Sequence, residues 1–287
     1  MSDRSKGIVC ILGAALSFAL MNTFVHLSGD IPTMQKAFFR NFVAVIFSFL
    51  ILKRNRISFR PPEKRHWLLL LARAAFGTLG LLCNFYAVDH LNISDASMLN
   101  KMAPFFAILV SYFLLRESLN LFQGLIVVAA FLGSLLIIKP NPANMALVPS
   151  LVGLLGGFGA GVAYSFVRLM SKRGVNSNLI VFVFSAFSCL VCLPYFIAVH
   201  APMTLPQLGC LLLAGTFGCS GQLCITSAYS FAPARDISVY DYTQVIFSAL
   251  LGWMFFAQIP DGFSVLGYTV ICGAGVLMFL YQRRHPA

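Results

Sequence analysis

The sequence predicts an all-α integral membrane protein with ten transmembrane helices, built as two inverted five-helix repeats with both termini in the cytoplasm. Three observations predict this fold. Of the 287 residues, 59% are hydrophobic and only 10% are charged, whereas a soluble domain carries about 25% charged residues. Apolar runs long enough to cross about 30 Å of hydrocarbon occur ten times. A set of residues also recurs about 140 positions later in the chain.

The ten apolar runs have 18 to 24 residues each, which is the length that a membrane-spanning helix requires. Turn-forming segments such as Pro61-Pro62 and Pro260-Asp261-Gly262 separate them, and we expect no soluble domain between them. In chain order the expected spans are 8–27, 34–52, 67–88, 96–115, 121–138, 151–170, 179–199, 208–231, 237–257 and 263–281.

The two halves of the chain share residues at a nearly constant offset. Phe24-Val25-His26-Leu27 recurs as Phe166-Val167-Arg168-Leu169, which lies 142 residues later. A second set recurs at an offset of 141, in which Phe76, Gly77, Gly80, Cys83, Ala87, Asp95 and Ser97 correspond to Phe217, Gly218, Gly221, Cys224, Ala228, Asp236 and Ser238. We therefore expect one repeat at residues 1–143 and another at 144–287. Because each repeat holds five spans, an odd number, the second is inverted relative to the first.

The distribution of Lys and Arg predicts the orientation. Fourteen of these residues fall on the side of the termini, and two, Lys36 and Lys139, fall on the other side. Basic loops stay in the cytoplasm, so both termini are expected there, in a multi-pass protein of the cell (inner) membrane. We expect a lipid bilayer and a small-molecule substrate as partners, in a monomer or homodimer.

Several other classes of protein fit the sequence poorly. The net charge of +11 comes from short loops rather than from a basic face, so we expect no nucleic-acid binding. All eight cysteines lie in apolar runs and are expected to pack as small hydrophobic residues, without a metal or other cofactor. No nucleotide-binding G-x-x-x-x-G-K motif, nucleophile–base pair or signal peptide is evident, so an enzyme is not expected.

Several segments resemble one family across essentially the whole chain. They are Ala37-Phe38-Phe39-Arg40-Asn41, Ala96-Ser97 through Pro104-Phe105, Leu114-Leu115-Arg116-Glu117-Ser118-Leu119, Tyr240-Asp241-Tyr242 through Ser248-Ala249-Leu250-Leu251-Gly252, and Pro260-Asp261. With these segments the chain resembles the ten-helix, EamA-like members of the drug/metabolite transporter superfamily. The family favours Glu after spans 4 and 9. This chain has Glu117 after span 4 and Gln258 after span 9.

The resemblance implies a cavity between the halves, lined mostly by spans 1, 3, 4, 6, 8 and 9, with spans 5 and 10 as peripheral scaffold. It implies movement of small organic metabolites, often outward, and the family includes carriers of amino acids and of S-adenosylmethionine. Inverted repeats permit alternating access. We therefore expect a secondary-active exporter of a small polar metabolite, such as an amino acid or a derivative. The alternatives are a carrier of S-adenosylmethionine or another nucleoside-like metabolite, a channel, or a membrane-embedded enzyme.

Charged groups inside the spans are functional candidates because burying them in hydrocarbon is costly. From the helix rise, we expect Arg40 and Lys101 in an outer layer and Arg73 and Asp241 in an inner layer. About 15 Å separates the expected levels of Lys101 and Asp241, so these two are not expected to touch, whereas Arg73 and Asp241 share a level at which they could pair. If protons drive transport, Asp241 is the best carrier, since burial favours a protonated carboxyl group, although a salt bridge would oppose this role. Alternatively, the cations extend to the nearer interface without a specific role.

Uncharged polar side chains inside the spans form a second group of candidates for substrate contact or gating. They are Asn22, Asn84, Tyr86, Asn100, Tyr164, Gln222, Tyr240 and Gln244. Tyr164, Gln222 and Gln244 are the preferred ligand contacts. Polar side chains also join helices to one another, and for each residue this structural role is an equal alternative. His26 is expected to be an interfacial histidine without a functional role.

Overall fold

The computed structural model describes residues 3–115, 120–139, 146–199, 201–231 and 238–284, and within these residues every regular element is a helix. In chain order they are α1 (Asp3–Leu27), α2 (Thr33–Arg54), α3 (His66–His90), α4 (Ile93–Asn100), α5 (Ala103–Leu115), α6 (Leu121–Ile138), α7 (Leu147–Lys172), α8 (Ser177–Ala198), α9 (Leu205–Phe231), the 3₁₀ helix η1 (Ser238–Tyr242), α11 (Thr243–Phe256) and α12 (Gly262–Arg284).

Eight of the described helices are long and apolar enough to cross a membrane: α1, α2, α3, α6, α7, α8, α9 and α12. The other two expected spans are each divided. Span 4 consists of α4 and α5, and span 9 consists of η1 and α11. Each of the four pieces is shorter than the 18 residues or so that a spanning helix needs, so only the pair could cross the bilayer. Glu117, which the family pattern singled out, lies outside the described residues.

The interruption of span 4 falls at Lys101 and Met102, between the end of α4 and the start of α5. Pro104 lies in the first turn of α5, and proline has no N–H to donate to the carbonyl oxygen four residues earlier, that of Asn100. The backbone N–H of Lys101 still bonds to the carbonyl oxygen of Ser97 at 3.0 Å, so α4 ends in an ordinary turn. The break places the Lys101 side chain at a helix end inside the bundle.

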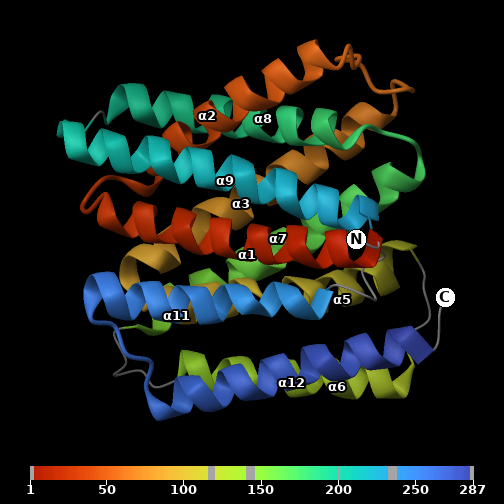
Figure 1. Ribbon diagram of the computed structural model, residues 1–287, viewed down its shortest axis with the longest axis vertical. Helices are drawn as coiled ribbons and strands as arrows, with labels where there is room; N and C mark the ends of the chain where they lie inside the picture. The colour runs from red at the N-terminus through yellow and green to blue at the C-terminus, as the bar shows by residue number, and fades with distance from the viewer. Residues whose placement is uncertain (1–2, 116–119, 140–145, 200, 232–237, 285–287) are drawn as a thin grey trace.

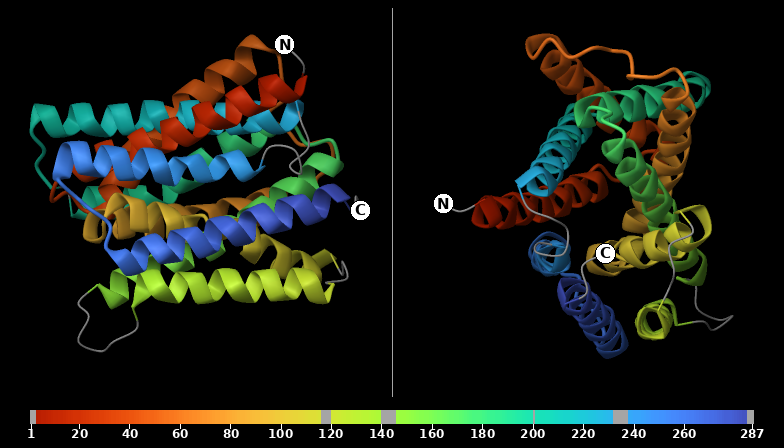
Figure 2. Two further views of the ribbon diagram at one scale, coloured as in Figure 1. Left: turned by 60° about the horizontal axis from the view of Figure 1, so that its bottom comes forward. Right: turned by 90° about the vertical axis from the view of Figure 1, so that its right-hand side faces the viewer.

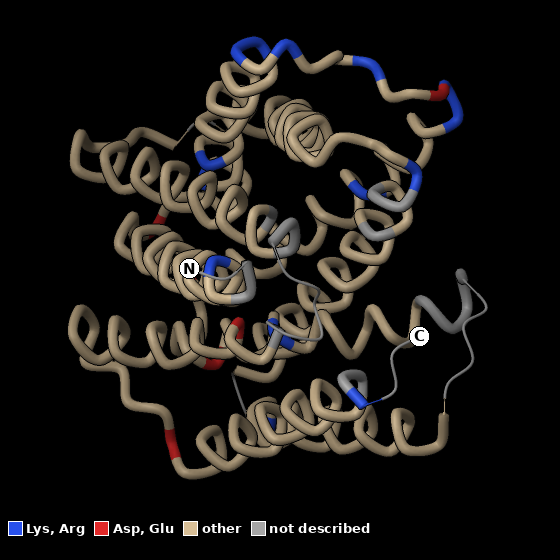
Figure 3. Tube along the Cα trace, turned by 45° about the vertical axis from the view of Figure 1, so that its right-hand side comes forward, with Lys and Arg blue, Asp and Glu red and all other residues tan. Residues whose placement is uncertain are grey.

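The helices run roughly parallel or antiparallel along one direction (Figure 1). The start of α1 and the end of α12 lie at the same end of the bundle, which we call the terminal end; the opposite end is the distal end (Figure 2). The loop from α2 to α3 also lies at the terminal end, and Figure 3 shows Lys and Arg gathered along it. Most of the charge is therefore concentrated on one end of the molecule.

Helix contacts between the two halves keep the same pattern when each helix is exchanged for its counterpart five spans away. α1 packs on α9, and their counterparts α7 and α3 also pack together. The contact of α2 with α9 corresponds to that of α8 with α3, and the contact of α5 with α7 corresponds to that of α11 with α1. Two contacts pair a helix with its own counterpart, α2 with α8 and α6 with α12, and a third joins α4 of span 4 to α11 of the corresponding span 9.

Glycines allow the helices to approach closely at two of these contacts. A Cβ atom on Gly159 of α7 would lie 2.8 Å from the carbonyl oxygen of Phe76 in α3, and one on Gly80 would lie 2.9 Å from the backbone nitrogen of Ala160. In the α6–α12 pair, a Cβ on Gly267 would lie 2.8 Å from the carbonyl oxygen of Gly133. These distances leave no room for a side chain, so the backbones themselves are in contact.

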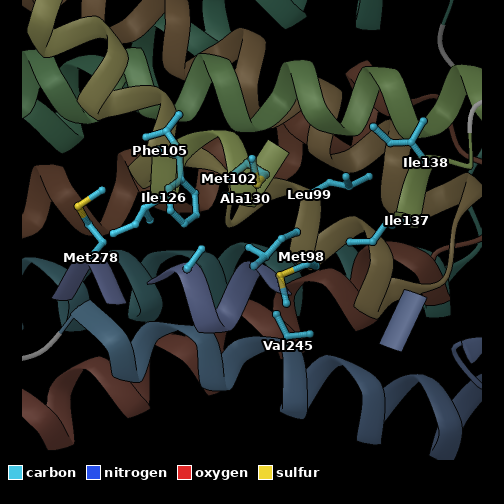
Figure 4. Close-up of a cluster of buried hydrophobic side chains, with 13 residues drawn as sticks. Met98, Leu99, Met102, Phe105, Ile126, Ala130, Ile137, Ile138, Val245 and Met278 are labelled. Atoms are coloured by element: carbon cyan, nitrogen blue, oxygen red, sulfur yellow. The ribbon is translucent and has the colours of Figure 1, made fainter. Parts of the chain in front are cut away.

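The α6–α12 pair lies at one edge of the bundle (Figures 1 and 2). A buried cluster joins this pair to α4, α5 and α11, with Ile126 from α6, Met278 from α12, Val245 from α11 and Phe105 from α5 (Figure 4). Spans 5 and 10 therefore pack on each other and on the bundle through apolar side chains and closely packed glycines.

Candidate functional site

Two charged candidates of the sequence analysis, Lys101 and Asp241, contact each other. Lys101 Nζ lies 2.6 Å from Asp241 Oδ2, and the exposed fractions of the two side chains are 9% and 16%. Lys101 follows α4, and Asp241 belongs to η1, so the ion pair joins the interruptions of both divided spans. The prediction that these residues lie about 15 Å apart, with Asp241 beside Arg73, is therefore wrong.

The error has two physical causes. Span 4 begins at Ile93 rather than at residue 96, which places Lys101 about 12 Å rather than about 8 Å along its helix. Depth along a helix also equals depth in a bilayer only when the helix stands upright, and membrane helices are usually tilted. The long side chain of Lys101 then bridges the remaining distance.

The two arginines form a second group, so the expected outer and inner layers are also wrong. The guanidinium carbons of Arg73 and Arg40 lie 4.0 and 5.7 Å from the ring centre of Phe184, which is a residue of α8. Both arginines are 4% exposed. Arg40 Nη1 donates to Asn41 Oδ1 at 2.7 Å, whereas Arg40 Nε and both Nε and Nη1 of Arg73 have no hydrogen-bond partner among the described residues.

Four buried polar side chains form a hydrogen-bonded chain across the middle of the bundle. Asn84 of α3 donates to Asn22 Oδ1 of α1 at 3.3 Å, and Asn22 donates to Ser97 Oγ of α4, also at 3.3 Å. Ser97 in turn exchanges a 2.8 Å hydrogen bond with Ser248 of α11. The chain thus connects three helices of the first half to one of the second. Asn84 Oδ1 is left without a partner.

The remaining candidates lie in different surroundings. Tyr164 of α7 lies within electrostatic range of Arg40, Arg73 and Asp241, yet it is 40% exposed. Tyr86 stacks on His90 near the end of α3, with ring centres 4.2 Å apart, and so lies away from the polar chain. Asn100 is the last residue of α4, and Gln222 is half-buried on α9. Tyr240 packs beside Ile11 and Ala228. Gln244 is buried in the first turn of α11.

Hydrogen bonds between the halves gather at the distal end. They join Gln35 to Ala201, Ser28 to Gln207, Ile93 to Gln258, Asp95 to Tyr268 and Lys139 to Asp261. His26 takes part as well, because Nδ1 lies 2.7 Å from the carbonyl oxygen of Val88 and Nε2 lies 3.4 Å from Gln258 Nε2. His26 therefore takes part in a contact between the two halves, in addition to its expected place at the membrane–water interface. Both cations of this end have carboxylate partners, since Lys36 also binds Asp89 at 2.6 Å.

Two cavities described by the structure lie away from these polar groups. One, of about 360 Å³, is lined by residues of the basic loop and by Trp67 at the terminal end. The other, of about 440 Å³, is lined by apolar side chains of α5, α6 and α7, including Leu109 and Phe131. All eight cysteines carry free thiols and are buried or half-buried, as expected for packing residues.

Comparison with known proteins identifies the family. The EamA-like transporter family matches residues 5–139 and again residues 149–281. The chain belongs to the EamA-like transporter family. Its relatives lie in the drug/metabolite transporter superfamily, and the family consists of transporters rather than enzymes. The sequence-based recognition is therefore confirmed, and the chain is a multi-pass membrane protein.

Relatives of this EamA-like chain include named transporters. It is 31% identical over 275 residues to the pseudopaline exporter CntI of Pseudomonas aeruginosa, with 95% of each chain covered. It is 24% identical to the riboflavin transporter of Brucella anthropi, covering 93% of this chain and 96% of that one. A solved crystal structure with 15% identity superposes with a TM-score of 0.66, covering 97% of this chain and 99% of that chain, which supports the fold.

Sequence reasoning on this EamA-like chain missed three contributors to the polar interior. Ser97 and Ser248 belong to the segments of the family resemblance, but neither is a site candidate in the sequence, because serine is frequent in apolar helices without a ligand role. Phe184 is one of 28 phenylalanines, and its place beneath two arginines depends on how α2, α3 and α8 pack.

Proposed function

We propose that this chain is a secondary-active carrier that moves a small polar metabolite, such as an amino acid or a derivative, outward through the cell membrane by alternating access. The ion pair of Lys101 with Asp241 carries the proposal. It joins two divided spans in the interior of the bundle, and helices interrupted in this way commonly hold the binding sites of transporters.

The repeat alignment supports a central position for this pair. Asn100 and Lys101 correspond to Asp241 and Tyr242 at the offset of 141. Spans that contact their own counterparts lie near the axis that relates the two halves, and span 4 contacts span 9 through α4 and α11. An ion pair on the axis is suited to rearrange when the halves move relative to each other.

The hydrogen bonds at the distal end support alternating access. They join the halves through hydrogen bonds of individual side chains, such as the two between Gln35 and Ala201 and the one between Gln258 and the backbone N–H of Ile93. Contacts of this kind exchange readily with water, so this end can open without disruption of an apolar core. In the proposed cycle the structure corresponds to the state in which the distal end is closed.

Charge supports the orientation with the distal end outside an inner membrane. The cations Lys36 and Lys139 at that end are both paired with carboxylates, Asp89 and Asp261. The loop between α2 and α3 at the terminal end carries four basic residues and one acidic residue, Glu63. Unbalanced basic residues remain in the cytoplasm. The name of the Pseudomonas relative, an exporter, supports outward movement.

A counterflow assay on purified protein in liposomes tests the proposal. Metabolites are first screened for a rise in the melting temperature of the detergent-solubilised protein, because a ligand of the folded state stabilises it. A carrier then shows saturable uptake of the radiolabelled ligand that increases when the liposomes are preloaded with the same compound. Flux that rises linearly with concentration and does not respond to preloading would identify a channel instead.

The Lys101→Met variant tests the role of the ion pair in this assay. We expect it to lose counterflow, since Asp241 would be left as an unpaired buried charge. Lys64→Met is the matched control, because Lys64 is exposed in the loop between α2 and α3. Equal counterflow by the wild type and by Lys101→Met would contradict the assigned role.

A further inference from the structure

We propose that Arg40 and Arg73 together bind a carboxylate group of the transported metabolite, which is therefore an organic anion at this point of contact. This inference rests on the proposed carrier function and specifies the class of its substrate. It starts from two buried guanidinium groups that share one aromatic ring and lack a counter-charge among the described residues.

First, Arg40 and Arg73 lack a counter-charge among the described residues. Two cations that are 96% buried repel each other and have lost their hydration, and this is costly unless an anion compensates. The described interior carboxylates are engaged elsewhere: Asp89 with Lys36, Asp95 with Tyr268, and Asp241 with Lys101. The Phe184 ring offers only partial compensation, because a cation–π contact is weaker than the pairing of a cation with a buried anion.

Second, the two arginines present hydrogen-bond donors that no described acceptor uses. Nε of Arg40 and both Nε and Nη1 of Arg73 are buried without an acceptor. A guanidinium group presents its N–H donors as a planar fork that matches the two oxygens of a carboxylate. Three unused donors on two neighbouring forks therefore suit a carboxylate better than a single neutral acceptor.

Third, two glycines leave the space that the two guanidinium groups occupy. A Cβ on Gly77 would lie 2.5 Å from Arg73 Nη1, and one on Gly218 would lie 2.9 Å from Arg40 Nε. Gly77 and Gly218 are counterparts in the repeat, at the offset of 141. Each half thus supplies a glycine at the same position, and each glycine leaves the space that one guanidinium group occupies. The arrangement is a built site rather than two cations that extend to the interface.

Fourth, an exposed side chain lies near the two arginines. Tyr164 lies within electrostatic range of both arginines and of Asp241, and it is 40% exposed although its neighbours Ala163 and Ser165 are buried. The accessible surface of the protein therefore extends to a side chain that interacts electrostatically with both arginines. When the carboxylate of a ligand binds the arginines, Tyr164 and the ion pair of Lys101 with Asp241 are close enough to interact with the rest of that ligand.

Thermal stability in detergent tests the proposal without a transport assay. The probes are sodium succinate, citrate and glutamate, compared with neutral succinamide, cationic putrescine and sodium chloride at matched ionic strength. We expect at least one carboxylate to raise the melting temperature of the wild type by several degrees, and we expect succinamide, putrescine and chloride not to do so. Equal stabilisation by chloride would identify an inorganic anion site only. A wild type that no carboxylate stabilises would also overturn the proposal.

Variants assign the effect to the two arginines. Arg40→Gln and Arg73→Gln should abolish the carboxylate-induced shift, while Arg60→Gln, an equal change of charge in the exposed loop, should retain it. Without ligand, both buried variants should melt at or above the wild-type temperature, because each removes an uncompensated buried charge. A purely structural role predicts lower melting temperatures instead. A full carboxylate shift in both buried variants would refute the assignment.

The glycine variants Gly77→Ala and Gly218→Ala provide a second test that keeps both charges. Each new methyl group displaces one guanidinium group, so we expect the carboxylate shift to fall in both variants. Unchanged shifts in both would contradict the proposed geometry. If carboxylates bind but counterflow is absent, the carrier proposal fails and the anion site stands. If Arg40→Gln and Arg73→Gln carry out wild-type counterflow, the anion site fails and the carrier proposal stands.

Discussion

Lys101 and Asp241 form an ion pair, with 2.6 Å between Nζ and Oδ2, although they are 140 residues apart in the chain. Each belongs to a span that is interrupted as a regular α-helix, one between α4 and α5 and the other at η1. The pair therefore connects the two halves of the molecule at the points where their backbones depart from α-helical geometry.

A double-mutant cycle on this pair is the first prediction. Lys101→Met or Asp241→Asn alone should destabilise the protein by about 3 kcal/mol, because the remaining partner becomes an unpaired buried charge or polar group. The double variant should be less destabilised than the sum of the two single variants. Unfolding in detergent, followed by circular dichroism, measures all four proteins. Strict additivity would show that the two side chains do not interact.

The identity of the central residues could be read from the sequence, but their pairing could not. Lys101, Asp241 and Asn22 were predicted because a charge or an amide inside an apolar run is conspicuous. The partner of Lys101 depends on where span 4 begins and on how the helices tilt, and neither is encoded in the hydropathy of the run. Helix bounds agreed closely, since length and turn residues define a span.

The hydrogen-bonded chain of Asn84, Asn22, Ser97 and Ser248 gives the second prediction. Ser97→Ala removes the acceptor for Asn22 and the partner of Ser248, at about 1 kcal/mol for each hydrogen bond lost. We expect counterflow to fall several-fold with only a modest drop in melting temperature. Thr269→Ala is the control, because that hydroxyl is exposed and bonds only to the carbonyl oxygen of Val265 in its own helix. A variant with normal counterflow would limit the chain to a structural role.

Close packing of α3 on α7 gives the third prediction. Gly159→Ala should destabilise the protein by about 1–3 kcal/mol, because its methyl group would meet the carbonyl oxygen of Phe76, a backbone atom that cannot move aside. Gly124→Ala is the matched control, since a Cβ there has nothing within 4 Å. Melting temperatures of the two variants in the same detergent decide the matter. Equal effects would mean that the α3–α7 contact is looser than described.

The loop residue Asp261 gives the fourth prediction, which concerns pH. Hydrogen bonds from Lys139 and from the backbone N–H of Ser264 lower the pKa of its carboxyl group. Because the pKa in the folded state is below the ordinary value of about 3.9, the stabilisation is present above that value and is lost as the pH falls through the folded-state pKa. The side chain is half exposed, so the effect at pH 7 is less than about 1 kcal/mol.

Asp261→Asn should therefore melt slightly below the wild type at pH 7, and the difference should be smaller at a pH below about 3.9. Asp30→Asn, a change in the exposed loop between α1 and α2, serves as the control and should show no difference at either pH. Melting curves across this range measure both variants. A difference between wild type and Asp261→Asn that grows on acidification would have the wrong sign for the described contacts.

Alternating access requires the distal end to open during the transport cycle. Gln35 and Ala201 face each other there across the two halves, through two hydrogen bonds of 3.0 and 3.1 Å. Cysteines at both positions, in a protein whose eight native cysteines are replaced, can be joined by a short thiol-specific cross-linker. We expect counterflow to stop when the cross-link forms, and to continue in the untreated protein and in treated single-cysteine variants. Counterflow at the full rate with the distal end covalently held would contradict the account.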